Sequence, residues 1–293
     1  MNAASAVGDA SVATDTEVIA SCWTSAGRVA PLDPDERSTY SIDERIAALV
    51  KTGWSGMGLN QADLAEMRGT IGFAELRRRL DVAGLKYREV EFLNDWWKAE
   101  ELWRDTWELL LEAAEAIGAS FVKVGAAFDG PEDDFGYLVE PFRRLGREAA
   151  ERGLRVAIEP IAFSGVDTSP KGAALVRDVG LSNVGICIDF WHVFRAGTSF
   201  SEITAQVPGE QIFSVEMGDC PRESLPDLFI DTTDNRRLCG EGDFDVQGLV
   251  DAIRATGFHG PWGVEMLSRE YRELPLEAAL RAAHDAALPY LRE

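Results

Sequence analysis

The chain has 293 residues, of which 46% are hydrophobic, and its 50 acidic and 29 basic residues give a formal net charge of −21 at pH 7. This length and apolar content allow one large hydrophobic core or two small ones. So acidic a chain repels phosphate backbones and anionic lipid, and no apolar run approaches the ~20 residues that span a bilayer. We therefore expect neither a nucleic-acid partner nor a membrane partner.

Two features of the sequence bear on the compartment in which the protein works. The first 16 residues are small and polar and lack the basic start and apolar centre of a signal peptide, so residues 1–16 are interpreted as a disordered N-terminal tail. The four cysteines, Cys22, Cys187, Cys220 and Cys239, are scattered and form no Cys-x-x-Cys pair. This usage is typical of a reduced protein, and we expect a cytoplasmic location.

From residue 17 onward, short apolar runs alternate with amphipathic stretches. The apolar runs predict strands within residues 17–23, 54–60, 86–93, 120–128, 154–160, 184–190, 211–219 and 260–267. The amphipathic stretches predict helices over residues 41–53, 73–85, 102–118, 138–153, 171–180, 199–208, 243–257 and 275–291. Several of these helices end in a glycine just before the next strand, where a helix C-cap favours that residue.

This alternation of eight strands and eight helices indicates a parallel sheet. Eight such units in a chain of this length favour a closed (β/α)8 TIM barrel. An open doubly wound sheet is the alternative, but no glycine-rich phosphate loop follows the first strand. We therefore predict an α/β fold with a single domain, a TIM barrel over residues 17–293.

The last four predicted strands each carry an acidic residue towards the C-terminal end: Glu159, Asp189, Glu216 and Glu265. Because alternate residues of a strand share a face, each acid shares its face with small residues, and the bulky apolar residues point the other way. The bulky face meets the helices, so the acids point into the barrel at the end that carries active sites. One such acid is often only a helix cap, whereas four in the same phase predict a shared site.

Carboxylates that converge on one cavity repel one another and must take up protons or bind a cation. We expect Glu159, Asp189, Glu216 and Glu265 to hold one divalent metal ion. An all-carboxylate ligand set favours Mn²⁺ or Mg²⁺, with Co²⁺ and Zn²⁺ as alternatives.

Two earlier strands also place charged residues on the face that points into the barrel, namely Lys123 and the pair Glu89 and Glu91. One interpretation is an internal ion pair between Lys123 and Glu91 that fills the barrel. The other is that Lys123 and Glu91 contact the oxygens of a substrate or stabilise an enolate. Trp23, near the end of the first strand, either packs in its loop or forms an apolar wall beside the substrate.

Five segments follow one another along the second half of the chain: VAIEP, IDFWH, IFSVEMGD, NRRLCGEGDFD and WGVEML. Through them the chain resembles the xylose isomerase-like TIM-barrel superfamily, which includes D-tagatose 3-epimerase, hydroxypyruvate isomerase, inosose dehydratase and 3-dehydroshikimate dehydratase. The resemblance covers nearly the whole chain after the tail. It implies metal ligation by the same four acids, although the relatives carry a neutral ligand where this chain has Glu216.

The resemblance also assigns roles to individual residues. His192 corresponds to a histidine that binds a substrate hydroxyl or carbonyl, and Arg236 to an arginine that contacts substrate oxygens in the epimerases. Glu159 and Glu265 correspond to the acid–base pair of the epimerases, whereas a dehydratase would use His192 as the proton donor. Structural roles remain open for two of them: His192 packed under its loop, and Arg236 exposed on the long loop after the seventh strand.

A metal ion flanked by two glutamates suits proton abstraction next to a carbonyl. We expect a metal-dependent isomerase or epimerase of a sugar or polyhydroxy ketone. The alternative is a metal-dependent dehydratase or lyase that acts on a keto-cyclitol or a 3-keto sugar.

Two further classes rank lower. A DNA-repair endonuclease with this barrel needs many histidines for its zinc cluster, and the chain has three. A non-catalytic or partner-dependent barrel subunit stays open because of Glu216. The expected partner is a small sugar or cyclitol substrate, and homo-oligomerisation is left open.

Overall fold

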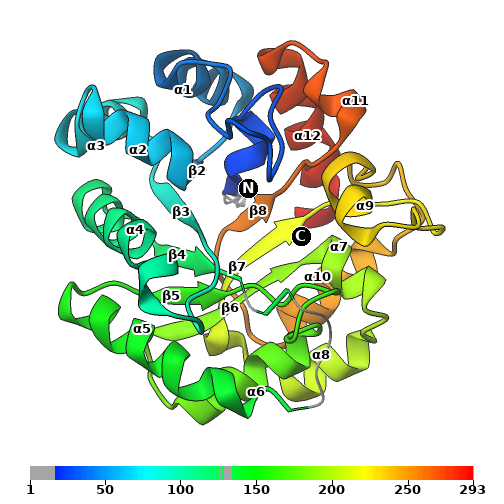
Figure 1. The fold of residues 1–293 in the computed structure, drawn as a ribbon. Helices are drawn as coiled ribbons and strands as arrows, with labels where there is room; N and C mark the ends of the chain where they lie inside the picture. Colours follow the sequence, from blue (N-terminus) through cyan, green and yellow to red (C-terminus); the bar gives the residue numbers. More distant parts are fainter. Residues whose placement is uncertain (1–16, 126, 129–133, 293) are drawn as a thin grey trace, which may run out of the picture.

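The structure is a computed structural model that describes residues 17–125, 127–128 and 134–292, so the predicted tail lies outside it. Eight parallel strands close into one barrel in chain order, and the last strand pairs with the first (Figure 1). Helices surround the barrel on its outside (Figure 1). The predicted single-domain TIM barrel is confirmed.

All eight predicted strands are present, each inside the run that predicted it. They are β1 (Val18–Ala20), β2 (Gly56–Asn60), β3 (Tyr87–Leu93), β4 (Phe121–Val124), β5 (Val156–Ile158), β6 (Val184–Asp189), β7 (Ile212–Met217) and β8 (Trp262–Val264). Their outward side chains are bulky and apolar, as Val156, Ile158, Ile186 and Ile188 illustrate, and these four residues have no exposed surface. Burial of this layer against the helices is the main source of the stability of the fold.

The eight predicted helices are also present. They are α1 (Ile42–Thr52), α3 (Phe73–Ala83), α4 (Arg104–Ile117), α5 (Val139–Glu151), α6 (Ser169–Val179), α8 (Phe200–Gln206), α10 (Val246–Ala255) and α12 (Leu276–Leu291). Helix α1 shows why such boundaries can be predicted, because Ser41 and Glu44 form a reciprocal capping box at its start. Gly53 ends it with a φ of 92°, a conformation that glycine adopts without strain.

Four additional short helices follow strands directly or lie in the loops beyond them. They are α2 (Gln61–Gly69), α7 (Phe190–Arg195), α9 (Leu228–Asp234) and α11 (Arg269–Arg272). Two of them are capped by the last residue of the preceding strand: Asn60 accepts from the amide of Asp63, and Asp189 accepts from the amide of His192. Of these helices, α2 lies beside α3 in the ring outside the barrel (Figure 1).

Short 3₁₀ helices complete the described chain: η1 (Cys22–Ser25), η2 (Glu100–Leu102), η3 (Gly136–Leu138) and η4 (Gly209–Gln211). Each of the four cysteines is buried with a free thiol. In the described part of the chain, none of the helices has the length and apolarity to span a lipid bilayer.

Candidate active site

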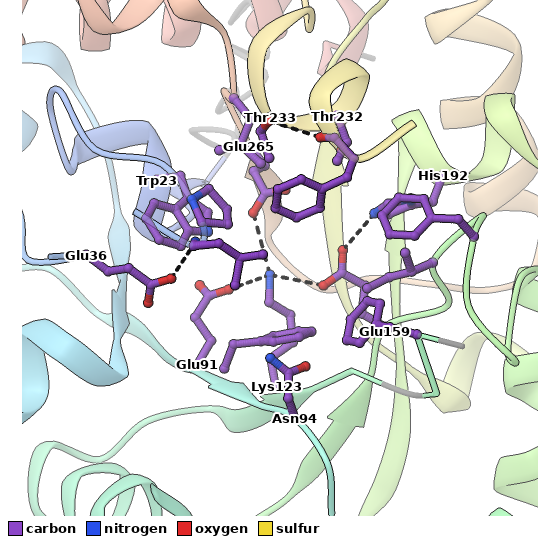
Figure 2. Close-up of a pocket in the computed structure, with 18 of the residues that line it drawn as sticks. Trp23, Glu36, Glu91, Asn94, Lys123, Glu159, His192, Thr232, Thr233 and Glu265 are labelled. Carbon is purple, nitrogen blue, oxygen red and sulfur yellow. Dashed lines mark hydrogen bonds and ion pairs between the residues drawn. The ribbon is translucent and has the colours of Figure 1, made fainter. Parts of the chain in front are cut away.

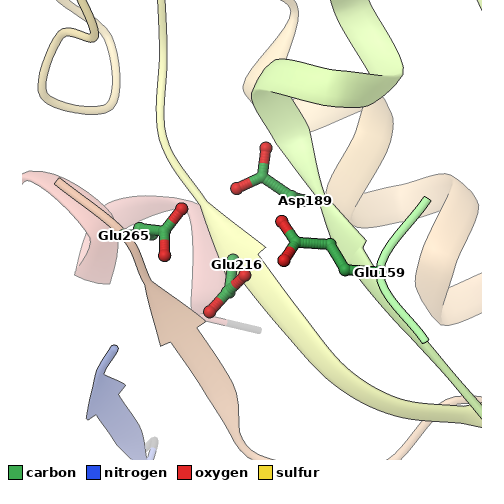
Figure 3. Close-up of side chains that lie close together, drawn as sticks. All are labelled: Glu159, Asp189, Glu216 and Glu265. Atoms are coloured by element: carbon green, nitrogen blue, oxygen red, sulfur yellow. The ribbon is translucent and has the colours of Figure 1, made fainter. Parts of the chain in front are cut away.

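The four predicted acids meet at the C-terminal end of the barrel (Figure 3). Asp189 and Glu216 are register partners across β6 and β7, while Glu159 and Glu265 directly follow β5 and β8. Each residue offers one carboxylate oxygen, and these four atoms all lie within 4.8 Å of one another. All four residues are at most 5% exposed. The strand phase therefore placed four carboxylates around one buried point.

Lys123 brings an ammonium group into this group of acids from β4. Its Nζ lies 2.7 Å from Glu91 Oε2 and donates a hydrogen bond of 2.6 Å to Glu216 Oε1. It also lies 3.7 Å from one oxygen each of Glu159 and Glu265, and so between these two carboxylates (Figure 2). The internal ion pair with Glu91 is present, and the same ammonium also reaches the four-acid group.

Arg236 supplies the second cation, from the segment that follows α9. Its Nη1 lies 2.6 Å from Asp189 Oδ2, and its Nη2 lies 3.1 Å from Glu265 Oε2. Nε and Nη2 also donate to the carbonyl and hydroxyl oxygens of Thr232. The side chain is 1% exposed and lies over the ring of Trp191, so it is not a surface residue of the loop. Arg236 joins two of the four acids and fixes their orientation.

His192 lies in α7 beside Glu159. Its Nδ1 accepts a hydrogen bond of 3.3 Å from the amide of Ala162, and its Nε2 lies 3.5 Å from Glu159 Oε1. Because Nδ1 is occupied as an acceptor, the ring hydrogen belongs on Nε2, the nitrogen that faces Glu159. His192 is buried and also lines the cavity described below. It therefore both packs under its loop and lies where a substrate can reach it.

These seven residues form what we call the lumen cluster: Glu91, Glu159, Asp189, Glu216, Glu265, Lys123 and Arg236. Burial, and then the charge of Glu216, raise the pKa of Glu265 well above its usual range. Burial raises the pKa of Glu216 to about 7 in spite of Lys123. Although burial alone would raise the pKa of Glu159, Lys123 and His192 lower it to about 2. With five carboxylates and two cations, the cluster has too little positive charge for all its acids to ionise.

This surplus of carboxylates is the observation that tests a metal site. Hard oxygen donors at the ends of four different strands converge within reach of one ion, which is the donor chemistry that a divalent cation requires. The four acids could therefore hold a metal ion, and its two positive charges would offset most of the surplus.

Glu89 lies in β3, two residues before Glu91, and has a different environment. One oxygen accepts from the hydroxyl of Ser214, and the other is buried with no hydrogen-bond partner in the described structure. Burial, followed by the charge of Glu216, raises the pKa of Glu89 to about 8. The sequence pattern gave Glu89 and Glu91 the same phase, but only Glu91 reaches Lys123 directly.

A cavity of about 450 Å³ opens above the lumen cluster (Figure 2). Its lining includes most of the predicted site residues: Trp23, Glu91, Lys123, Glu159, His192, Arg236 and Glu265. Asp189 and Glu216 lie behind this lining, bonded to Arg236 and Lys123. Every residue that the sequence proposed for the site thus lies at or directly behind one cavity.

The sequence pattern missed the apolar residues of the same lining: Pro31, Leu32, Phe92, Phe128, Ile161, Phe163, Phe229 and Leu267. Most of them lie in the loops after strands, where no periodicity marks the residues that face inward. Phe92 adjoins Glu91, and the alternation of a strand would place its side chain on the outward face. The loops after different strands come together only in the closed barrel.

Comparisons with known proteins give the same fold and related enzymes. A family model described as Xylose isomerase-like TIM barrel matches residues 46–292. The 3-dehydroshikimate dehydratase of Pseudomonas aeruginosa is 27% identical over 245 residues, which is 81% of this chain and 38% of that protein. The inosose isomerase of Halalkalibacterium halodurans is 27% identical over 152 residues, which is 51% of this chain and 52% of that protein.

The chain thus spans between about two fifths and half of the length of these curated relatives. Among solved structures, that of IOLI protein with a binding zinc atom aligns with a TM-score of 0.76 and 17% identity, over 94% of this chain and 98% of the other. At this identity the likeness supports the shared fold.

Proposed function

Because the chain belongs to the xylose isomerase-like TIM barrel family, we propose that it is a metal-dependent isomerase or epimerase of a sugar or polyhydroxy ketone. The observation that carries this proposal is the convergence of Glu159, Asp189, Glu216 and Glu265 on one buried point below the cavity. Curated relatives of the chain carry the names of enzymes, a dehydratase and an isomerase. The reaction proposed for this site is removal of a proton next to a carbonyl.

The same four acids are proposed to hold the metal ion. Their donor set, made of carboxylate oxygens alone, favours Mn²⁺ or Mg²⁺, with Co²⁺ and Zn²⁺ as alternatives. A bound divalent ion supplies Lewis-acid polarisation of a substrate carbonyl.

Glu159 and Glu265 are proposed as the acid–base pair. They flank the Lys123 ammonium at equal distances of 3.7 Å, which places one carboxylate on each side of the site. The pKa of Glu159 is lowered by Lys123 and His192 and that of Glu265 is raised by burial, so the two carboxylates differ in their hold on a proton, and we assign Glu159 as the base and Glu265 as the group that returns the proton. Return to the neighbouring carbon gives an isomer, and return to the opposite face of the same carbon gives an epimer.

Lys123 and Arg236 have supporting roles in this proposal. The Lys123 ammonium, 3.7 Å from each catalytic carboxylate, lies where it can stabilise negative charge on a substrate oxygen as the proton leaves. Arg236 holds Asp189 and Glu265 and presents its guanidinium to the cavity, where it can bind a substrate hydroxyl. Glu91 fixes Lys123, and Trp23 forms part of the wall.

A dehydratase is the second candidate, and the contact between His192 and Glu159 favours it. His192 carries its ring hydrogen on Nε2, 3.5 Å from Glu159, so in this reaction Glu159 removes the α-proton and His192 Nε2 is the proton donor. The Nε2 proton passes to the β-hydroxyl, which departs as water when its bond to carbon breaks, and the proton that Glu159 has taken up can then return to Nε2. The relative named 3-dehydroshikimate dehydratase supports this candidate to the same degree as the inosose isomerase supports the first.

Proton exchange with solvent tests both candidates. The protein with bound Mn²⁺ is incubated in D₂O with ketoses, inososes and 3-keto-glycosides, and deuterium at each carbon is measured by NMR. We expect exchange at a carbon next to the carbonyl of at least one compound. A metal-loaded protein that exchanges no proton in any of them contradicts both candidates and favours a non-catalytic or partner-dependent subunit.

The His192→Asn variant separates the two reactions. In an isomerase or epimerase it should mainly weaken substrate binding, so exchange stays measurable at saturating substrate. In a dehydratase it should stop water loss while the α-proton still exchanges, because the leaving hydroxyl no longer receives a proton.

A further inference from the structure

The cavity above the lumen cluster has two chemically different ends. Its buried floor is charged, and Lys123, Glu159 and Arg236 there are at most 5% exposed. Its mouth is formed by partly or fully exposed apolar side chains, among them Leu32 and Phe128. A binding site with this division suits a ligand that is itself polar at one end and apolar at the other.

The apolar side chains of the mouth come from opposite sides of the barrel. Trp23 and Leu32 lie after β1, and Phe163 lies after β5, which is four strands away in a closed barrel of eight. Phe163 packs against Phe128 and Phe229, with ring centroids 6.2 and 6.5 Å apart. The mouth therefore has an apolar wall on each side, and a flat group can lie between the two.

Leu32 belongs to this apolar wall although both its exposure and its backbone conformation are unfavourable. Its side chain is 74% exposed, and its φ is 67°, a left-handed conformation that is unfavourable for a bulky residue. The carboxylate of Glu36 holds the loop in this shape by accepting a 2.7 Å hydrogen bond from the Leu32 amide. Glycine or asparagine would occupy this conformation more easily. An exposed, strained hydrophobic residue at the mouth of a pocket indicates contact with a ligand.

Polar side chains of the upper wall are bonded to the protein. Glu36 also accepts a hydrogen bond of 2.7 Å from the amide group of Gln61, and Gln61 accepts one of 3.0 Å from the amide of Phe92. These bonds connect the loop after β1 with the start of α2 and with β3 at the mouth. Asn94 adds one exposed amide at the edge. The upper cavity thus offers a ligand mainly apolar surface.

We propose that the substrate is a keto-sugar or polyhydroxy ketone joined to a flat apolar group, such as an aryl aglycone. The polar part lies on the charged floor, which rests on the proposed function, and the apolar part lies between the Leu32 side and the Phe163 side. A cavity of about 450 Å³ is in the range that holds ligands larger than one sugar ring. A bare sugar would leave the apolar mouth in contact with water.

Paired glycosides test this proposal directly. Dissociation constants are measured by calorimetry for the phenyl and methyl β-glycosides of glucose, galactose and xylose, which differ within each pair only in the aglycone. We expect the phenyl glycoside of at least one sugar to bind about tenfold or more tightly than its methyl partner, because the ring buries apolar surface. Equal affinities in every pair, including the case in which no glycoside binds, overturn the proposal.

Two mouth variants locate the preference. Leu32→Asn fits the left-handed backbone, and Phe229→Ala shortens the opposite wall; each should reduce the phenyl preference to within about threefold, mainly by weakening the binding of the phenyl glycoside. Val82→Gln removes an equally exposed apolar side chain from α3, 77% exposed, and should change nothing. Mouth variants that retain the full phenyl preference contradict the proposal.

This outcome is independent of the proposed reaction, because the glycosides are not required to react. Proton exchange on simple ketoses without any phenyl preference contradicts the amphipathic substrate alone. A phenyl preference in a protein that exchanges no proton contradicts the proposed reaction alone.

Discussion

Two of the places where the molecule buries charge differ in their balance of cations and anions. Arg45 of α1 and Asp63 of α2 form a fully buried pair of one cation and one anion. Arg45 also donates to Ser25 Oγ at 3.1 and 2.9 Å, and Asp63 accepts from the amide of Ser38 at 2.7 Å. In this pair each charge has its counter-charge and further hydrogen bonds.

The lumen cluster is built from the same kinds of groups but has five carboxylates and two cations. Its pKa values are displaced in opposite directions, with Glu159 lowered to about 2 and Glu265 raised. Burial of charge therefore does not by itself indicate a functional site. A balanced, saturated pair is a structural feature, whereas a buried surplus of one sign indicates that a further ion or a substrate belongs there.

The largest predicted effect is a loss of catalysis on substitution of acids in the lumen cluster. Glu159→Gln and Glu265→Gln keep an oxygen in place but cannot exchange a proton, so each should lower the rate of solvent deuterium exchange by about 10²–10⁴-fold. Asp63→Asn, the matched change in the balanced pair, should leave the rate per folded molecule unchanged. Full turnover in both glutamine variants would contradict the acid–base assignment.

The next effect is on stability and belongs to the balanced pair. Arg45→Met leaves Asp63 buried without a partner and should lower the free energy of unfolding by about 3–5 kcal/mol, measured by urea titration. Arg45→Met combined with Asp63→Leu should recover most of this loss, because no unpaired charge remains. Metal binding should stay as in the parent protein in every variant that folds. A change in metal affinity would show that the two clusters are not independent.

Glu89 should make the free energy of unfolding depend on pH, because its pKa is raised to about 8, mainly by burial. An unfolded glutamate has a pKa of about 4.3, so between these values the folded state holds a proton that the unfolded state has released. This contribution to stability is complete below about pH 4 and is lost as the pH rises through 8. Glu89→Gln should therefore gain about 2 kcal/mol relative to the parent protein between pH 6 and pH 8, measured by urea titration. A constant difference across this range would contradict the raised pKa.

The smallest predicted effect concerns the cation inside the cluster. Lys123 donates to Glu216 at 2.6 Å and would repel a metal ion held by the same acids. Lys123→Met should therefore tighten Mn²⁺ binding by about tenfold, and Glu216→Gln should weaken it by a similar factor. Calorimetry on both variants and on the double variant gives the coupling between the two residues. Weaker Mn²⁺ binding by Lys123→Met would show that the ammonium supports the site instead of competing with the ion.

The barrel and the convergence of its acids could be predicted from the sequence because both depend on local periodicity. Alternation within a strand determines which face Glu159 or Asp189 occupies, and closure of the barrel brings equivalent positions together. The contacts between the acids and their partners depend on loops and could not be predicted in this way. Arg236 meets Asp189 across 47 residues because α9, too short for a helical repeat to show, places it there.

The apolar residues at the mouth of the cavity could not be predicted from the sequence for the same reason. Leu32 and Phe163 lie in loops more than 100 residues apart, and neither belongs to a periodic run. Their opposition follows only from the closed order of the strands.

The central claim is that the surplus of carboxylates in the lumen cluster is a binding site for one divalent ion. Calorimetric titration of chelator-treated protein with Mn²⁺ tests it most directly. We predict saturable binding of about one ion per chain, strongly weakened in Asp189→Asn and unchanged in Asp63→Asn. Absence of saturable binding, or equal binding in Asp189→Asn and the parent protein, would contradict the claim.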